Sequence, residues 1–241
     1  MVPYAKTQID HSNATATAST HATTVAHDAT STVVTQNAHA TSTARAIVAA
    51  TETVVIANRN PYPPQTGTLV ELAPTPKVGT GTICNQTNGA MHATNNHTGS
   101  VGYCWGGNPY DNFAYDVEMT IVKGDCGGII FREDGTEGSK EYMFNVCQYG
   151  YHTVDIDEGA SQQFKNVTYA QTTPGLKQGL NQMNLIGVVA QGQNITVYVN
   201  KQQVASFTDS TYGSGLVGVD VWNTNSNGTD VVFANQRVWK I

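Results

Sequence analysis

Hydrophobic and polar residues alternate most clearly around a polar turn at residues 134–138, which separates two apolar runs. The turn carries glycine and charged residues, so the segment predicts a β-hairpin. If Cys126 is placed opposite Cys147, the facing pairs fall on two sides of the hairpin. On the apolar side we expect Gly127–Val146, Ile129–Phe144 and Phe131–Tyr142. On the other side we expect Cys126–Cys147, Gly128–Asn145, Ile130–Met143 and Arg132–Glu141.

Three independent features favour this register: an aromatic core face, a pair of opposed cysteines, and an ion pair between Arg132 and Glu141 near the exposed hairpin end. A shift by one residue would move every side chain to the wrong face. Directly opposed residues on antiparallel strands lie ~4.5–5.5 Å apart, which is within reach of a disulfide. We therefore predict a disulfide between Cys126 and Cys147.

The two remaining cysteines, Cys84 and Cys104, are then expected to form a second disulfide across a 21-residue span. Four cysteines allow three pairings, and the hairpin register favours this one. Neither spacing is the paired CxxC of a zinc site. Disulfides indicate an oxidising setting, so we expect an extracellular or cell-surface protein.

Alternating patterns continue to the C-terminus and predict an all-β domain. Many short strands separated by polar turns are typical of a β-sandwich. Residues 85–102, rich in Asn, Gly, Thr and His, are expected to form a long loop tied at its base by the second disulfide. The predicted strands cover residues 68–72, 112–122, 126–133, 141–148, 151–157, 165–170, 183–191, 194–200, 204–209, 215–222 and 230–241.

The N-terminal segment has a different composition, since 28 of the 43 residues from His11 to Thr53 are Ala, Ser or Thr. Such low complexity is typical of a solvated, flexible stalk. An approximate heptad stripe of small and apolar residues favours a second interpretation, in which the segment is helical and assembles with other chains. Its twelve threonines disfavour an isolated helix. The stripe comprises Ala22, Ala26, Ala29, Val33, Ala40, Ala44, Ile47 and Val54, and we take Val33, Ala40, Ala44 and Ile47 as the candidate assembly residues.

A proline-rich stretch divides this segment from the β pattern. Proline cannot continue a helix and pushes the preceding residue toward an extended conformation. We therefore expect a Thr/Ala-rich stalk or assembly segment at residues 1–60, a Pro-rich linker at 61–67 and a β-sandwich domain at 68–241.

Charge limits the partners. The net charge is −6, with only 12 Lys and Arg, and this argues against nucleic acid, which needs a basic face. No window approaches the ~18 consecutive apolar residues of a membrane span.

Four C-terminal segments carry a family resemblance. They show an apolar strand followed by Gly, a strand ending in Asn, the sequence Gly-Leu-x-Gly, and Phe-x-Asn-x-x-Val, at residues 184–189, 192–200, 215–219 and 232–239. The domain thereby resembles the concanavalin A-like lectin/glucanase superfamily, in its laminin-G-like and keto-disaccharide-hydrolase-like branches. The hairpin at 124–132 is similar to bacterial surface ectodomains that follow Thr/Ala-rich linkers. The resemblance implies a jelly roll of two antiparallel sheets.

Catalytic motifs of that superfamily are not found. Its glycosidases place two carboxylates on one strand face in a Glu-x-Asp-x-x-Glu arrangement. Asp155 and Asp157 come nearest, but we interpret them as a solvated rim or part of a calcium site. Asp116 and Glu118 share a strand face without a third acid. We therefore expect a non-enzyme with no catalytic residues, and a glycoside hydrolase is the less favoured interpretation.

Aromatic and amide side chains are the candidate ligand contacts, because rings stack on sugar faces and amides bind hydroxyl groups. The candidate ligand-binding residues are Tyr149, Tyr151, His152, Trp222 and Asn223. Each also has a purely structural interpretation, at a sheet edge or over the core. We expect no cofactor and no metal ligands, although calcium is common in the superfamily and stays open.

Two functional hypotheses follow. The first is a stalked, non-catalytic cell-surface module that binds a glycan or another cell-surface polymer, or acts in adhesion. The second is a structural subunit of an extracellular filament or stalk bundle, assembled through residues 11–57. The lectin-like pattern favours the first, and the stripe in the N-terminal segment favours the second.

Overall fold

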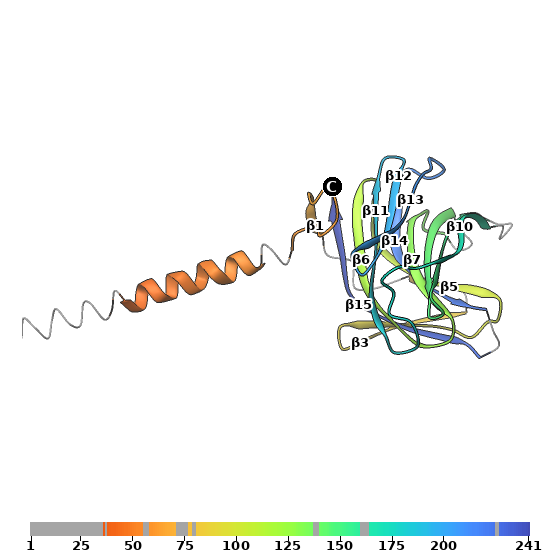
Figure 1. Cartoon of the computed structure of the whole chain (residues 1–241), viewed down its shortest axis with the longest axis horizontal. Helices are drawn as coiled ribbons and strands as arrows, with labels where there is room; N and C mark the ends of the chain where they lie inside the picture. The colour runs from red at the N-terminus through yellow and green to blue at the C-terminus, as the bar shows by residue number, and fades with distance from the viewer. Residues whose placement is uncertain are drawn as a thin grey trace, which may run out of the picture. The chain divides into compact units, whose positions relative to one another are not determined.

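A computed structural model describes residues 36, 38–54, 58–70, 77–78, 81–136, 140–159, 164–224 and 227–241. The chain divides into two units, Met1–Asn58 and Arg59–Ile241, which are considered separately. In the first unit residues 38–54 form the helix drawn in orange in Figure 1. The second unit is built of strands.

The helix is fully exposed along its described length. The hydroxyl groups of Ser42, Thr43, Thr51 and Thr53 donate to backbone carbonyl oxygens three or four residues earlier, at 2.8 to 2.9 Å. Such bonds satisfy the hydroxyl groups within the helix itself. Within the described residues no helix combines the length and the apolar character needed to cross a membrane.

The candidate assembly residues lie partly on this helix. Ala40, Ala44 and Ile47 are exposed on it, and Ile47 is 62% accessible. Val33 lies outside the described residues. Assembly through this stripe stays a prediction.

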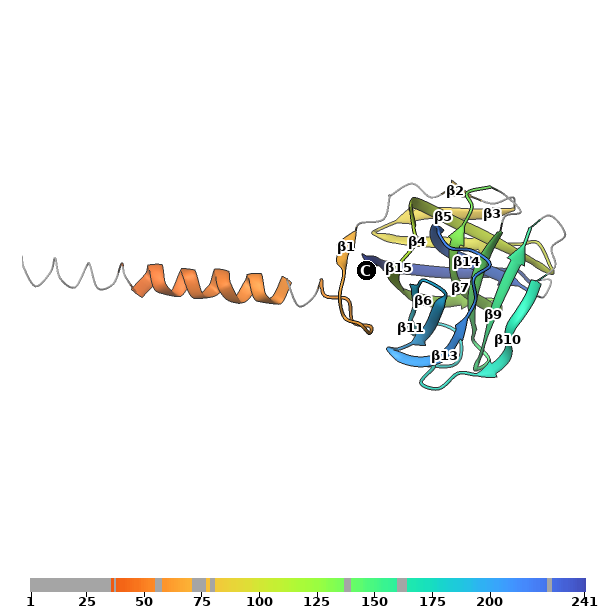
Figure 2. The same cartoon turned by 90° about the horizontal axis from the view of Figure 1, so that it is seen from above.

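Two antiparallel sheets form the second unit, and Figures 1 and 2 show them as the two layers of a sandwich. One sheet has the order β13-β12-β11-β6-β15-β4-β3, with β1 also paired to β15, and the other has the order β10-β9-β8-β7-β14-β5-β2. The all-β jelly roll predicted from the sequence is confirmed. The strands are β1 (Thr68–Val70), β2 (Lys77–Val78), β3 (Thr82–Thr87), β4 (Ala90–Asn95), β5 (Ser100–Tyr110), β6 (Phe113–Lys123), β7 (Cys126–Glu133), β8 (Lys140–Cys147), β9 (Tyr151–Glu158), β10 (Phe164–Thr172), β11 (Met183–Gln191), β12 (Asn194–Val199), β13 (Gln202–Thr208), β14 (Gly215–Asn223) and β15 (Thr229–Lys240).

The central hairpin, β7 and β8, has the predicted register. Cys126 lies opposite Cys147, and the pairs continue in step to Phe131 opposite Tyr142. Phe144 is fully buried between the sheets, as expected for the apolar face. The alternation of this hairpin therefore defines an inner face toward the core and an outer face.

Both predicted disulfides are present. Cys126 and Cys147 join neighbouring strands with a Cα–Cα distance of 4.1 Å. Cys84 and Cys104 are joined at 6.1 Å, and they lie on β3 and β5, which belong to different sheets. The second disulfide therefore ties the two layers together.

The prediction of a long loop at residues 85–102 is wrong. This stretch contains the β3–β4 turn, all of β4 and the start of β5. In β4, Met91, Ala93 and Asn95 are buried, while the intervening residues are half-buried. The polar composition concealed this alternation, because the small and polar residues here fit the pleated surface next to β15.

The contacts of Arg132 also differ from the prediction, because backbone carbonyl groups, and not the predicted ion pair with Glu141, hold its side chain. On β14, Leu216 and Val217 pair with Glu133 and Phe131, so Arg132 is the extra residue of a β-bulge, with φ of 55°. Its guanidinium is buried and donates to three backbone carbonyl oxygens at 2.7 to 2.9 Å, those of Asp111, Gly192 and Tyr212.

The stretch at residues 61–67, expected to be a linker, packs on the domain instead. Tyr62 is 1% exposed, and its hydroxyl donates to Asp116 Oδ2 at 3.1 Å. Arg237 holds the same carboxylate through two hydrogen bonds of 2.9 and 2.8 Å. Gly187 makes room for the ring, since a Cβ there would lie 2.6 Å from the Tyr62 hydroxyl oxygen. This segment therefore covers part of the outer face of the eight-stranded sheet.

Candidate functional site

The outer face of the seven-stranded sheet carries an unusual set of acidic side chains. Ile129, Val154 and Val219 belong to the core between the sheets, so the residues that alternate with them point outward. Among these outward residues, four carboxylates on β8, β9 and β14 are almost fully buried: Glu141, Asp155, Asp157 and Asp220. We call this surface, defined by those four residues, the acid face.

Asp220 and Asn145 meet above the central strand β7. With the Asn145 amide oriented so that its nitrogen faces Asp220, Nδ2 donates to the two carboxylate oxygens at 2.9 and 3.2 Å. They can meet because position 128, between them, is glycine. A Cβ at Gly128 would lie 2.5 Å from Asp220 Oδ1 and 2.8 Å from the Asn145 amide.

Burial dominates the electrostatics of the aspartates. Burial, and then the neighbouring Asp155, raise the pKa of Asp220 well above its usual value. Burial also raises the pKa of Asp155, against a hydrogen bond from Asn166 that lowers it. The pKa of Asp157 is raised by burial as well, opposed by a hydrogen bond from the Gly159 backbone N–H at 2.9 Å.

Aromatic rings from three strands surround these acids. Tyr103 on β5 is hydrogen-bonded to Glu141, and burial followed by the charge of Glu141 raises its pKa. Trp105, also on β5, packs against Ile130 and Met143. Met143 lies directly opposite Asp155, so the Trp105 ring reaches across the sheet toward the acids.

Two further rings, those of Phe164 and Trp222, lie on the same sheet face. Phe164 on β10 packs on the cluster of Trp105, Ile130 and Met143. Its ring centroid lies 5.7 Å from that of Trp222 on β14. Both side chains are half-buried.

Several buried polar atoms on this face lack a hydrogen-bond partner among the described residues, and two of them belong to Trp105 and Asp155. One is the indole Nε1 of Trp105, a side chain that is 5% exposed. The other is Oδ2 of Asp155, which is fully buried. Unpaired buried polar atoms are unfavourable, so such atoms call for a ligand or water partner.

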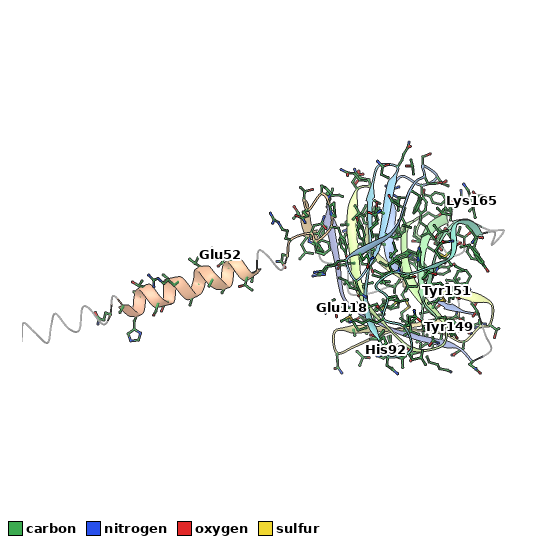
Figure 3. All side chains as sticks on the ribbon, viewed as in Figure 1. Glu52, His92, Glu118, Tyr149, Tyr151 and Lys165 are labelled. Carbon is green, nitrogen blue, oxygen red and sulfur yellow. A yellow bond between two sulfur atoms is a disulfide. The ribbon has the colours of Figure 1, made fainter. Side chains whose placement is uncertain are left out.

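The structure separates the five predicted ligand residues. Tyr151 and Trp222 lie on the outer face, in the row of the Cys126–Cys147 disulfide. Tyr149, labelled with Tyr151 in Figure 3, is 60% exposed, and its hydroxyl donates to Asp125 at 3.1 Å. His152 is buried with its ring 6.0 Å from that of Phe144, and Asn223 is fully buried in line with the core residues of β14. Of the five, the structure therefore places Tyr151 and Trp222 on the outer face.

The acid face was missed in the sequence, and its signal was misread. The sequence indicates a solvated rim or part of a calcium site for Asp155 and Asp157, but the two residues are 0% and 4% exposed. In both β9 and β14 the acids alternate with core residues such as Val154 and Val219. An acid that alternates with core residues in a central strand belongs to one defined face, and that pattern was available in the sequence.

The acid face does not have the arrangement of a metal site as far as the structure describes it, since no group of three His, Cys, Asp or Glu side chains is placed to hold a metal ion in those residues. What the face offers instead is a set of hydrogen-bond acceptors bordered by rings.

Comparison with known proteins gives a family and a fold. The family model of the 3-keto-alpha-glucoside-1,2-lyase-like domain matches residues 60–238. No curated protein matches the chain.

Several solved structures share the fold. The carbohydrate-binding module CBM66 from Bacillus subtilis is 18% identical, with a TM-score of 0.57, over 69% of this chain and 96% of that one. A Bacillus subtilis protein of unknown function with a galectin-like fold is 8% identical, with a TM-score of 0.52, over 72% and 96%. The exoplasmic/lumenal domain of VIP36, bound to Ca²⁺ and Man3GlcNAc, is 11% identical, with a TM-score of 0.51, over 71% and 91%. At these identities the likeness shows the concanavalin A-like fold.

Proposed function

The chain belongs to the 3-keto-alpha-glucoside-1,2-lyase-like family, and from that premise we propose that it is a non-catalytic extracellular module that binds carbohydrate on its acid face. The observation that carries this proposal is the combination of half-buried rings with buried acceptors on one sheet face. Tyr103, Phe164 and Trp222 supply the rings, and Asp155 and Asp220 supply acceptors.

The chemistry of a sugar matches that combination. A sugar ring has an apolar face of C–H groups, which packs on an aromatic ring, and hydroxyl groups, which donate to carboxylates. Ligand sites in general combine an apolar or aromatic lining with a few placed polar groups. A carbohydrate-binding module and a domain solved with Man3GlcNAc share this fold, which supports the same interpretation.

An extracellular location is part of the proposal. Two disulfides support it, because such bonds persist in oxidising compartments. The Thr/Ala-rich segment before the domain would then act as a stalk that holds the module away from a surface.

Calorimetric titration of the full chain with a panel of oligosaccharides tests the proposal. Trp222→Ala should weaken binding by about tenfold or more, which corresponds to ~1.4 kcal/mol. Met183→Ala is the matched control, because Met183 is an exposed apolar residue on the other sheet, at 45% accessibility. If no oligosaccharide binds at millimolar concentration, or if both variants bind equally well, the proposal fails.

One observation favours catalysis as a second candidate. Burial raises the pKa values of both Asp155 and Asp220, and the neighbouring Asp155 raises that of Asp220 further, which is how catalytic acids are often prepared. The test is product release from α-glucosides and their 3-keto forms by the full chain. Turnover that disappears in Asp155→Asn and in Asp220→Asn would establish an enzyme, whereas binding without product supports the module.

A further inference from the structure

The two sheets differ in how they hold buried carboxylates on their outer faces. Asp116, buried on the outer face of the eight-stranded sheet, is held by two hydrogen bonds from Arg237. The described hydrogen-bond partners of Asp155, Asp157 and Asp220 are all neutral: the side chains of Asn166 and Asn145, and the backbone N–H of Gly159.

Two cations of this sheet, Arg132 and Lys165, make their contacts elsewhere. The Arg132 guanidinium donates to three backbone carbonyl oxygens at one end of the sandwich. Lys165 on β10 lies 4.0 Å from Asp209. Burying a carboxylate without a positive partner is unfavourable, and the raised pKa values of Asp155 and Asp220 express that cost.

A second, independent observation indicates that something binds there. The indole N–H of Trp105 has no acceptor among the described residues, although its side chain is 95% buried and its ring lies against Met143, opposite Asp155. A ligand with hydroxyl or ether oxygens would accept from this donor. The free Oδ2 of Asp155 would accept from the same ligand.

The arrangement of the carboxylates indicates which kind of cation they can bind. The described carboxylates are not grouped in threes as metal ligands, so a compact metal ion does not match them. A protonated amine has three N–H donors that can spread over several acceptors. Its charge is also attracted to the faces of rings such as Tyr103 and Trp222.

We propose that the acid face binds a cationic sugar, an amino sugar whose protonated amine lies against Asp155 and Asp220 while its ring packs on Trp222; this rests on the carbohydrate-binding function proposed above. The amine supplies the positive partner that the aspartates lack. The sugar oxygens supply the acceptor for Trp105. A neutral sugar can accept a hydrogen bond from Trp105, but it has no positive charge to place beside the aspartates.

Two of the rings assigned to the site meet on this sheet face. Phe164 packs on the cluster of Trp105, Ile130 and Met143, and its ring centroid lies 5.7 Å from that of Trp222. Because Phe164 is one of the rings assigned to the site, Phe164→Ala should weaken binding of an amino sugar by at least a few fold.

The test is calorimetry on the full chain at about pH 6, where a sugar amine is protonated. The probes are the glucosamine trimer, its N-acetylated form, cellotriose and trilysine. We expect the glucosamine trimer to bind at least about tenfold more tightly than the other three. Asp155→Asn and Asp220→Asn should each remove most of that preference, while Glu118→Gln, which removes a carboxylate from the outer face of the other sheet, should retain it.

The outcomes separate this inference from the function on which it rests. If neutral trimers bind as tightly as the glucosamine trimer, the amino-sugar inference is wrong and carbohydrate binding stands. If trilysine binds equally well, the face selects cations without regard to sugar, and the inference is also wrong. If Asp155→Asn and Asp220→Asn both retain the preference for the glucosamine trimer, the amine binds elsewhere and the amino-sugar inference is wrong. If no sugar binds, the proposed function itself fails. Circular dichroism checks that each variant is folded, and the comparison of ligands on the unaltered chain decides without any variant.

Discussion

At the scale of single residues, Arg132 shows how a charged side chain can be structural. Its guanidinium is 1% exposed and joins three segments through the backbone carbonyl oxygens of Asp111, Gly192 and Tyr212. Hydrogen bonds from a charged group contribute ~1.5–3 kcal/mol each, and their loss leaves three carbonyl groups to find new partners. Arg132 therefore stabilises the end of the sandwich where these segments meet.

We predict that Arg132→Ala lowers the free energy of unfolding by ~3 kcal/mol or more, because it removes all three bonds. Phe144→Ala should have a similar effect, ~3–5 kcal/mol, by opening a cavity in the core. Urea unfolding measures both, and the exposed Arg59→Ala is the control. A loss below ~1 kcal/mol at Arg132 would show that the bonds are not formed.

The pH dependence of stability tests Asp220. Its pKa in the folded chain lies well above the unfolded value, so folding favours the protonated form. The stabilising effect of that proton is complete below about pH 4 and is lost as the pH rises through the raised pKa. Asp220→Asn should therefore be more stable than the unaltered chain at about pH 7, and this advantage should vanish near pH 4. Thermal unfolding at pH values between about 4 and about 7 measures the stability difference between Asp220→Asn and the unaltered chain. If that difference favours the variant less at about pH 7 than at about pH 4, the account is wrong.

At the scale of elements, the β7–β8 hairpin organises the seven-stranded sheet. Its inner residues fill the core, and its outer residues, with Gly128 among them, let Asp220 and Asn145 meet above it. The Cys126–Cys147 disulfide closes the open end of the same hairpin. The hairpin therefore links the stability of the fold to the geometry of the acid face.

Removing the hairpin disulfide by Cys126→Ala with Cys147→Ala should lower stability by ~3 kcal/mol, from the loop of this length that it closes. Urea unfolding gives the change, and the Cys84→Ala, Cys104→Ala pair provides the comparison, since that bond joins different sheets. Peptide mapping that found Cys126 joined to Cys84 or Cys104 would contradict the connectivity itself.

The same elements show what sequence can predict. The register of β7 and β8 was readable because aromatic, glycine and cysteine positions all require one pairing. The strand β4 was not, because its inward residues, Met91, Ala93 and Asn95, have too little apolar character to stand out. A β-bulge also leaves no clear signal, since the positive φ of Arg132 depends on contacts with distant carbonyl groups.

The candidate site was predictable only in part, for a similar reason. Tyr151 and Trp222 were found because rings at strand ends are visible in a sequence. Tyr103 and Asp220 were not, since β5 and β14 become neighbours only through the sheet order of the fold. The hydrogen bond between Tyr103 and Glu141 depends on tertiary pairing that no local pattern encodes.

At the scale of the whole molecule, the two units pose separate questions. The described helix at residues 38–54 is exposed throughout and rich in threonine, and such a helix is marginal alone in water. Contact with other chains would bury its stripe of small and apolar residues. That arrangement is the structural-subunit hypothesis, and it is compatible with a binding module at the C-terminal end.

Sedimentation tests assembly directly. If the stripe mediates it, the full chain should sediment as an oligomer and Ile47→Asp should reduce its mass, because a charge would be buried in the contact. Val48→Asp is the matched control, since Val48 is similarly exposed but lies outside the stripe. Monomers in all three samples, the unaltered chain and the two variants, would contradict assembly and leave the segment as a spacer.

The central claim, that the acid face binds carbohydrate, is tested most directly by the indole N–H signals of the three tryptophans during titration with an oligosaccharide. Trp105 and Trp222 lie on the outer face of the seven-stranded sheet, whereas Trp239 is buried beside Tyr62 on the eight-stranded sheet. The account predicts that the two-dimensional nuclear magnetic resonance signals of Trp105 and Trp222 shift together and saturate, while the signal of Trp239 stays in place. Saturation binding that moves Trp239 alone, or that moves none of the three, would contradict it.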